Sequence, residues 1–193
     1  MSQLMKLFFQ INVIIIIIIA GLFSVRANAE SGDNNVSRHS IGIDLGQVFL
    51  HGNNFGKKYN NSLGFGLRYN YAASDIFELE ADFSGSNHSE NALKIMYSTL
   101  GLKTNFIYYD KLVPYATVGL GFYKPRIQVQ NDIATKTAFG MRLGLGADLL
   151  LNEHVSIGVM MNYRNIFSSN AKLLNGNQYD VSGAFTNFLM RLS

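Results

Sequence analysis

The feature that most constrains the fold of this chain is an alternation of apolar and polar residues that continues from residue 41 almost to residue 192. A period of two places alternate side chains on opposite faces of a β-strand. In residues 63–71, for example, every odd position is apolar or aromatic and every even position is Gly, Arg or Asn. We predict an all-β fold of eight strands, each of about ten residues, with no helix among them. The other segments with this pattern are residues 41–46, 77–83, 99–106, 115–122, 139–149, 155–164 and 181–192.

The first thirty residues have the three parts of a secretory signal peptide. Lys6 gives a positive charge, residues 13–23 form an uninterrupted apolar run, and residues 27–29 have the small-x-small pattern of a cleavage site. We therefore predict cleavage after Ala29. An uncleaved membrane anchor is the alternative, but residues 7–23 are only 17 positions with two polar interruptions, and a spanning helix needs about 20 apolar residues.

Cleavage at this point divides the chain into three parts. Residues 1–29 are the signal peptide, residues 30–39 are a short polar leader, and residues 40–193 are the β-domain. The leader either stays in the periplasm as a tail or enters the β-domain as a plug. Removal of Lys6 and Arg26 leaves 14 Lys and Arg against 13 Asp and Glu, so the net charge falls from +3 to +1. A charge this small gives no reason to expect a nucleic-acid partner.

Alternation alone does not show which face of the strands meets water. A soluble barrel or sandwich, such as a periplasmic protein that binds an apolar ligand, buries its apolar face. An outer-membrane barrel turns that face to lipid and keeps polar side chains inside. The connections favour the second fold, because short periplasmic turns alternate with longer external loops in such barrels. The predicted short connections are residues 72–75, 109–113 and 150–154, and the long ones are residues 51–61, 84–92, 125–136 and 167–180.

The predicted polar face carries five acids, five bases and twelve Gly. Gly weakens a strand but leaves room for large side chains inside a narrow barrel. Buried charges persist only when they are paired. We therefore predict a lumenal salt-bridge network that plugs the barrel, with a narrow polar path for small solutes as the alternative. Its members are Asp44, Arg68, Glu78, Glu80, Asp82, Lys103, Arg142, Asp148, Arg164 and Arg191.

Two motifs at short turns carry a resemblance to a known family. They are residues 114–121 (PYATVGLG) and residues 152–158 (NEHVSIG), and they accompany the predicted signal peptide. With the strand pattern over residues 40–193, they resemble the small eight-stranded outer-membrane barrels of Gram-negative bacteria, the OmpA/OmpX/OmpW-like superfamily. One departure is that such barrels usually end on an aromatic residue, whereas this chain ends on Leu192 and Ser193.

The resemblance implies an eight-stranded antiparallel up-and-down transmembrane β-barrel in the cell outer membrane, preceded by a cleavable signal peptide. Both termini would lie in the periplasm and four loops outside. It implies a monomer that is assembled by periplasmic chaperones and the barrel-assembly machinery and that contacts outer-membrane lipid and lipopolysaccharide. The function we expect is structural or surface-interactive, and an OmpW-like channel for small solutes is the alternative.

The predicted long loops carry a net charge of +4, because seven Lys and Arg oppose only Glu90, Asp132 and Asp180. We expect these bases to contact the phosphates of lipopolysaccharide, and a solvated basic rim is the alternative. The residues expected to make this contact are Lys57, Lys58, Lys124, Arg126 and Lys136, and the same loops contain Lys94 and Lys172.

One motif raises the question of catalysis. Some eight-stranded outer-membrane barrels that modify lipid A use a His-x-Ser pair with a downstream acid, and His154-Val155-Ser156 has this spelling. The motif falls at a predicted short turn on the periplasmic side, and residues 167–170 supply no acid to orient the His, as a triad requires. We therefore expect no enzymatic activity. The other three His are isolated and there is no Cys, so we expect no metal or cofactor.

Overall fold

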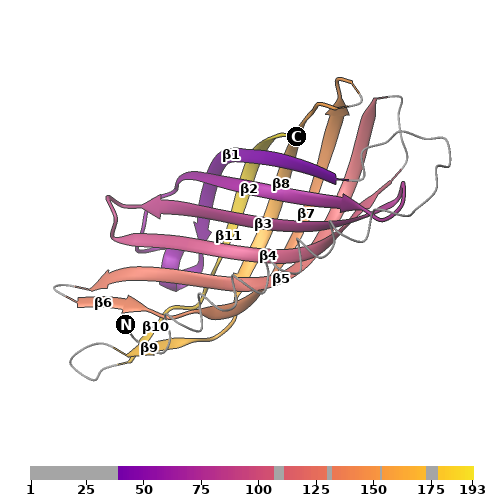
Figure 1. The fold of residues 1–193 in the computed structure, drawn as a ribbon. Coiled ribbons are helices and arrows are strands. Elements are labelled where there is room, and N and C mark those ends of the chain that lie inside the picture. Colours follow the sequence, from indigo (N-terminus) through magenta and orange to yellow (C-terminus); the bar gives the residue numbers. More distant parts are fainter. Residues whose placement is uncertain (1–38, 107–110, 130–131, 153, 173–177) are drawn as a thin grey trace. The chain divides into compact units, whose positions relative to one another are not determined.

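Eight antiparallel strands close into a barrel in the computed structural model, which describes residues 39–106, 111–129, 132–152, 154–172 and 178–193 (Figure 1). Each barrel strand pairs with the next along the chain, and β1 pairs with β11 to close the sheet. This confirms the predicted all-β, eight-stranded antiparallel barrel. The predicted signal peptide and residues 30–38 of the leader lie outside the described residues. The barrel strands are β1 (His39–His51), β2 (Ser62–Ala72), β3 (Phe77–His88), β4 (Leu93–Asn105), β5 (Leu112–Val129), β7 (Ala138–Leu150), β8 (Ser156–Ile166) and β11 (Gly183–Leu192).

The last two residues, Leu192 and Ser193, both take part in the sheet. Ile43 pairs with Leu192, and Leu192 points outward, 51 % exposed. Ser193 continues the ladder, because its backbone N–H and C=O both bond to Ser156, at 3.0 and 2.9 Å. Its hydroxyl accepts a hydrogen bond from Arg68 Nη2 at 2.7 Å. Ser193 therefore belongs to the sheet through its backbone and contacts a buried Arg inside the barrel through its side chain.

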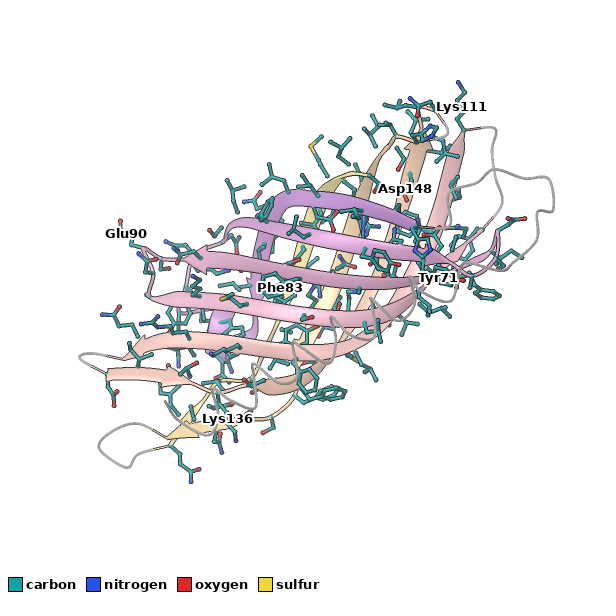
Figure 2. All side chains as sticks on the ribbon, viewed as in Figure 1. Tyr71, Phe83, Glu90, Lys111, Lys136 and Asp148 are labelled. Carbon is teal, nitrogen blue, oxygen red and sulfur yellow. The ribbon has the colours of Figure 1, made fainter. Side chains whose placement is uncertain are left out.

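The two ends of the barrel differ in their connections. Residues 73–76, 106–111 and 151–155 connect strands at one end, which we call the turn end. The opposite end, the loop end, carries the remaining connections and the short strands within them. Figure 2 shows Tyr71 and Lys111 at the turn end, Glu90 and Lys136 at the loop end, and Phe83 between them.

Strands extend further into the predicted long loops than the alternation indicated. β3 continues to His88, which leaves only residues 89–92 as a turn before β4. β5 continues to Val129 and pairs with β6 (Asp132–Thr135), and β9 (Asn170–Lys172) pairs with β10 (Gln178–Asp180). The predicted bounds of the connections over residues 84–92 and 125–136 are therefore wrong, because most of these residues belong to strands. Backbone pairing does not depend on an apolar outward face, so strands continue where the outward residues become polar.

The prediction of no helix in the β-domain has one exception. Residues 52–56 form η2 (Gly52–Gly56), a single turn of π-helix between β1 and β2. Gly52 has a φ of +76°, a conformation that Gly adopts without steric cost. Among the described residues, no helix is long and apolar enough to cross a membrane.

The outward face of the barrel is apolar, the reverse of a soluble protein. Leu67, Phe83, Leu100, Leu120 and Phe122 are each about half exposed or more, although side chains of this kind are normally buried in water-soluble folds. The inward face carries most of the buried charged residues. The alternation therefore puts the apolar side chains on the outside, as predicted.

The interior consists of two layers rather than one polar layer. Towards the turn end it contains the charged side chains, whereas towards the loop end it contains a cluster of buried apolar and aromatic residues. The prediction of a polar face along the whole lumen is therefore incomplete. The apolar layer includes Val48, Leu50, Phe55, Leu93, Ile95, Tyr97, Tyr123, Ile127, Ala134, Ala138, Ile166, Ala171, Val181 and Phe185.

Candidate functional site

The interior charges form a network centred on two acids of β3. Arg142 Nη1 lies 2.7 Å from Glu80 Oε1 and also pairs with Asp82. Arg164 Nη2 lies 3.2 Å from Asp82 Oδ2, and Arg191 Nη2 lies 2.7 Å from Glu80 Oε2. Both acids and all three guanidinium groups are almost completely buried. Every charge in this cluster therefore has an opposite charge within contact distance, which such burial requires.

The remaining predicted lumenal charges extend the network in two directions. Arg68 Nη2 lies 3.4 Å from Asp44 Oδ1. Lys103 Nζ lies 2.9 Å from Asp148 Oδ2 and 3.2 Å from Glu78 Oε1. The structure thus places all ten predicted residues inside the barrel and brings each into a salt bridge.

The ion pairs of the central cluster reach across the barrel. In the closed strand order, β8 is separated from β3 by β2, β1 and β11 on one side and by β4, β5 and β7 on the other. The pair between Asp82 on β3 and Arg164 on β8 therefore spans the full width of the lumen. An eight-stranded barrel is only wide enough for its own side chains, so these pairs obstruct it.

Glycines beside the network provide the space for these large side chains. A Cβ on Gly101 would lie 3.1 Å from Arg142 Nη2, and a Cβ on Gly146 would lie 2.5 Å from the hydroxyl oxygen of Tyr115. The hydroxyl of Tyr115 in turn accepts a hydrogen bond from Arg191. The room that the sequence predicted is therefore occupied by Arg142 and by Tyr115, a partner of Arg191.

The apolar layer closes the lumen at the loop end. Phe55 of η2 is completely buried and packs with Phe185, Tyr97 and Tyr123 in one cluster. The ring centroids of Tyr97 and Phe185 are 5.6 Å apart, and those of Tyr123 and Phe185 are 6.2 Å apart. This spacing is typical of packed aromatic pairs. The layer is thus a cluster of buried, packed side chains to which η2 contributes Phe55.

Tyr97 connects the apolar layer to the charged one. Arg164 Cζ lies 4.2 Å from the centre of its ring, within the range of a cation–π interaction. Its hydroxyl accepts a hydrogen bond from Asn187 Nδ2 at 2.6 Å. The sequence contained a signal for this layer: in residues 93–97 the odd, inward positions are apolar or aromatic, whereas further along β4 the inward positions are polar.

The predicted lipopolysaccharide contacts fall into separate groups at the loop end. Lys124 and Arg126 point outward from β5, and Arg126 pairs in register with Lys94 of β4. These three residues, the rim cluster, lie on two adjacent strands just beyond the apolar wall. Lys57 and Lys58 instead follow η2, where Lys58 Nζ donates to the Tyr179 hydroxyl at 3.3 Å. Lys136 is exposed between β6 and β7.

The His-x-Ser motif lies at the turn end. His154 is exposed, and its backbone N–H donates to Asn152 Oδ1 at 2.8 Å. Ser156 begins β8 and pairs with Ser193 through its backbone. Within the described part of the chain, no three His, Cys, Asp or Glu side chains are grouped as ligands for a metal ion.

Solved structures with this fold include several small outer-membrane barrels. The neisserial surface protein A matches with a TM-score of 0.64 at 10 % identity, over 81 % of this chain and 96 % of that one. The attachment invasion locus protein Ail of Yersinia pestis matches with a TM-score of 0.54 at 14 % identity, over 80 % and 95 %. The N-terminal barrel domain of Pseudomonas aeruginosa OprF matches with a TM-score of 0.52 at 14 % identity, over 80 % and 96 %. At these identities the similarity is one of fold.

Sequence comparison gives the family directly. A comparison with curated protein sequences found no match. The family model described as the outer membrane protein beta-barrel domain matches residues 15–187. This range covers all the barrel strands except the end of β11. The chain therefore belongs to the outer membrane protein beta-barrel domain family and is an integral protein of the Gram-negative outer membrane.

Proposed function

We propose that this protein is a closed barrel with a structural or surface-interaction role and that it does not conduct solutes. The observation that carries this proposal is the double filling of the lumen. Salt bridges such as Asp82–Arg164 cross its width, and the apolar layer under Phe55 closes the loop end. A solute would have to break buried ion pairs and also displace an aromatic cluster, and both steps are costly.

A surface role agrees with what the fold leaves accessible. With the lumen filled, the loop end offers η2, the β5–β6 hairpin and the β9–β10 hairpin to the exterior. Similar barrels include a surface protein and an attachment invasion locus protein. We propose that the loops of this chain likewise meet an external surface and that the protein has no enzymatic activity. Closure through β1 and β11 leaves no unpaired barrel edge, which supports a monomer.

The rim cluster supports contact with lipopolysaccharide. Lys94, Lys124 and Arg126 are exposed on adjacent strands at the loop end, which faces outward in such barrels. Clustered cations at a membrane surface attract anionic headgroups. Assembly by periplasmic chaperones and the barrel-assembly machinery belongs to the same proposal, because an outer-membrane barrel has to cross the periplasm unfolded.

Planar-bilayer conductance of the protein purified from outer membranes tests the closed barrel. We expect no discrete openings in the wild type. The Arg142→Ala, Arg164→Ala variant and the Phe55→Ala variant should each remain closed, because the other layer still fills the lumen. The triple variant should conduct. Heat-modified gel mobility establishes that each variant is folded. Wild-type openings would support an OmpW-like channel instead, and a silent, folded triple variant would contradict the two-layer seal.

Lipopolysaccharide co-purification tests the rim cluster. The variant Lys94→Gln, Lys124→Gln, Arg126→Gln should retain much less lipopolysaccharide than the wild type. Lys57→Gln, Lys58→Gln, Lys136→Gln is the matched control, since it removes the same charge from loop positions outside the rim cluster. Equal retention by the two triple variants would contradict a specific role for the rim cluster.

A further inference from the structure

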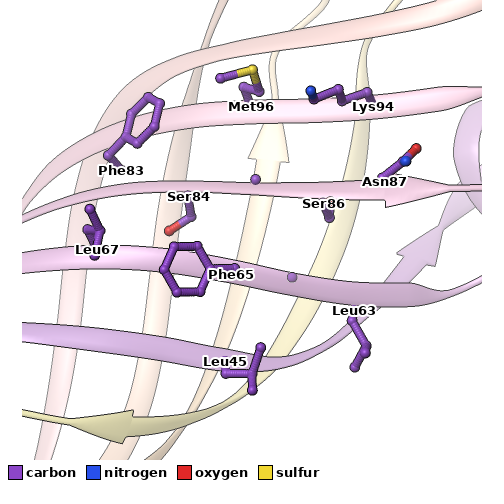
Figure 3. Close-up of a pocket in the computed structure, with 12 residues that line it drawn as sticks. Leu45, Leu63, Phe65, Leu67, Phe83, Ser84, Ser86, Asn87, Lys94 and Met96 are labelled. Atoms are coloured by element: carbon purple, nitrogen blue, oxygen red, sulfur yellow. The ribbon is translucent and has the colours of Figure 1, made fainter. Parts of the chain in front are cut away.

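A hollow of about 430 Å³ lies on the outward wall of β2, β3 and β4 (Figure 3). Its lining is largely apolar and includes Leu63, Phe65, Phe83 and Met96. The close-up shows Phe65 and Phe83 on neighbouring strands with Met96 beside them. These side chains belong to the wall that meets lipid, so the hollow opens towards acyl chains rather than water.

The hollow exists because of Gly85. This residue lies between inward-facing Ser84 and Ser86 and therefore faces outward. In register it is flanked by Phe65 on β2 and Met96 on β4. Because Gly85 has no side chain, the surface is recessed between Phe65 and Met96.

Gly85 also differs from the other glycines of the strands. A Cβ there would meet Ile95 O at 3.4 Å and Met96 Cγ at 3.8 Å, which is ordinary van der Waals contact. At every other strand glycine that the structure describes, a Cβ would lie less than 3.0 Å from another atom. Gly in a strand interior is destabilising relative to Ala. At Gly85 a larger residue would fit without steric conflict, so sterics do not explain why Gly stands there. A need to keep the hollow open does explain it.

One end of the hollow is polar and cationic. Lys94 and Asn87 line it towards the loop end, and both are labelled at the same side of the close-up (Figure 3). Lys94 pairs in register with Arg126, and Met96 pairs with Lys124. The apolar hollow therefore reaches the rim cluster at Lys94, and the other two rim residues lie on the neighbouring strand. An amphiphile would match this arrangement, with its acyl chain in the apolar hollow and its phosphorylated headgroup at the cations.

We propose that the hollow around Gly85 holds one acyl chain of a lipid A-type glycolipid whose phosphates meet the rim cluster. The inference rests on the proposed contact with lipopolysaccharide and adds a defined site for its hydrocarbon. Lys94 lines the hollow, and Lys124 and Arg126 lie on the next strand. This group of three cations favours a headgroup with more than one phosphate over a phospholipid with one. The acyl chain gains the apolar contacts that Gly85 leaves available.

A second hollow provides a control for apolar area alone. It measures about 440 Å³, lies around Ala116 on the outward faces of β4, β5, β7 and β8, and is lined by residues such as Leu102, Val118 and Met161. No charged residue lines it. Filling it should therefore change the lipid-facing area without affecting the proposed site.

Native mass spectrometry of the full protein, extracted with its bound lipid in a mild detergent, tests the proposal. Gly85→Leu and Gly85→Val fill the hollow at two sizes, so that one can report if the other fails to fold. We expect retention of the multiply phosphorylated glycolipid to fall about ten-fold in Gly85→Leu, as if about two methylene groups were no longer buried. Ala116→Leu should retain it at the wild-type level.

The outcomes separate the acyl-chain site from the rim cluster. Loss in the Gly85 variants with retention in Ala116→Leu supports the site. Wild-type retention in folded Gly85→Leu and Gly85→Val overturns it, and loss on rim neutralisation would then leave the headgroup contact standing alone. Equal loss in Ala116→Leu also overturns it, because any change of apolar wall would then suffice. A singly phosphorylated phospholipid as the bound species overturns the choice of ligand.

Discussion

The ring of Phe55 lies directly over Gly183, where a Cβ would be 2.5 Å from Phe55 Cε2. Phe55 comes from η2, and Gly183 is the first residue of β11. The contact therefore holds the first loop-end connection against the last barrel strand. It also explains why the chain has Gly where β11 enters the barrel, since any side chain there would displace the ring.

Gly183→Val and Phe55→Ala should therefore both weaken the loop end. Loss of the buried ring should lower the free energy of unfolding by about 3 kcal/mol or more, because the cavity it leaves cannot fully collapse. Gly183→Val should have an effect in the same direction, since the new methyl groups overlap the ring. Urea titration of the lipid-reconstituted protein measures both. A Gly183→Val variant as stable as the wild type would show that the ring is free to move.

Glu80 and Glu78 lie on the same strand, but their substitution should cost very different amounts of stability. Glu80→Gln removes the acid shared by Arg142 and Arg191 in a fully buried setting, so we expect a loss of about 3–5 kcal/mol. Glu78→Gln is the control, because its side chain is 15 % exposed and its partner Lys103 keeps Asp148. We expect about 1 kcal/mol or less there. Equal losses would mean that burial of the network does not govern its energetics.

Alanine at two strand glycines should act with opposite sign. Gly85→Ala should raise the free energy of unfolding by about 0.5–1 kcal/mol, since the new Cβ meets only ordinary contacts. Gly119→Ala should lower it by about 1–3 kcal/mol, because its Cβ would lie 2.9 Å from Leu100 O in the sheet backbone. Urea titration of the lipid-reconstituted protein measures the free energy of unfolding of both variants. Effects of the same sign would refute the steric distinction between the outward and inward faces.

Asp180 in the β9–β10 hairpin should make the external loops sensitive to acid. Burial raises its pKa, but hydrogen bonds from Ser182 and Asn54 outweigh it, so the pKa lies below the ordinary value of 3.8. A lowered pKa stabilises the folded loop fully above the ordinary value, and this stabilisation is lost as the pH falls through the lowered pKa. NMR titration of the carboxyl carbon should show the shift.

Asn54 Nδ2 donates a hydrogen bond to Asp180 Oδ2 at 2.7 Å, so replacing Asn54 tests the cause of the lowered pKa. Asn54→Ala should move the pKa of Asp180 upward, towards 3.8. Asn53→Ala, a substitution at an exposed neighbour in η2, should leave it unchanged. An unchanged pKa in Asn54→Ala would assign the shift to Ser182 and Lys58 instead.

The alternation predicted the faces of the strands because side-chain direction depends only on position within a strand. Glu80 and Arg142 could therefore both be placed inside from the sequence. Their pairing could not, because it depends on which strands lie opposite each other after closure and on the register between them. The grouping of Lys94 with Arg126 was missed for the same reason.

Phe55 was missed for a different reason. It lies in a connection without periodicity, where nothing in the local sequence shows whether an aromatic side chain turns inward. The turn at residues 89–92 also differed from the prediction, since a polar outward face ends the alternation signal before the strand itself ends at His88. Sequence patterns thus locate the lipid-facing band well and the structure beyond it poorly.

The long sequence separation of the ion pairs has a consequence for the order of folding. Asp82 bonds to Arg142 and Arg164, 60 and 82 residues later, and Glu80 bonds to Arg191, 111 residues later. β3 therefore carries acids with partners on β7, β8 and β11, which follow much later in the chain. Contacts of such high order slow folding. Glu80 lacks its partner Arg191 until β11 is in place, so the network is complete only when β11 joins β1. A barrel that entered hydrocarbon before closure would therefore carry both an incompletely paired acid and an unpaired sheet edge.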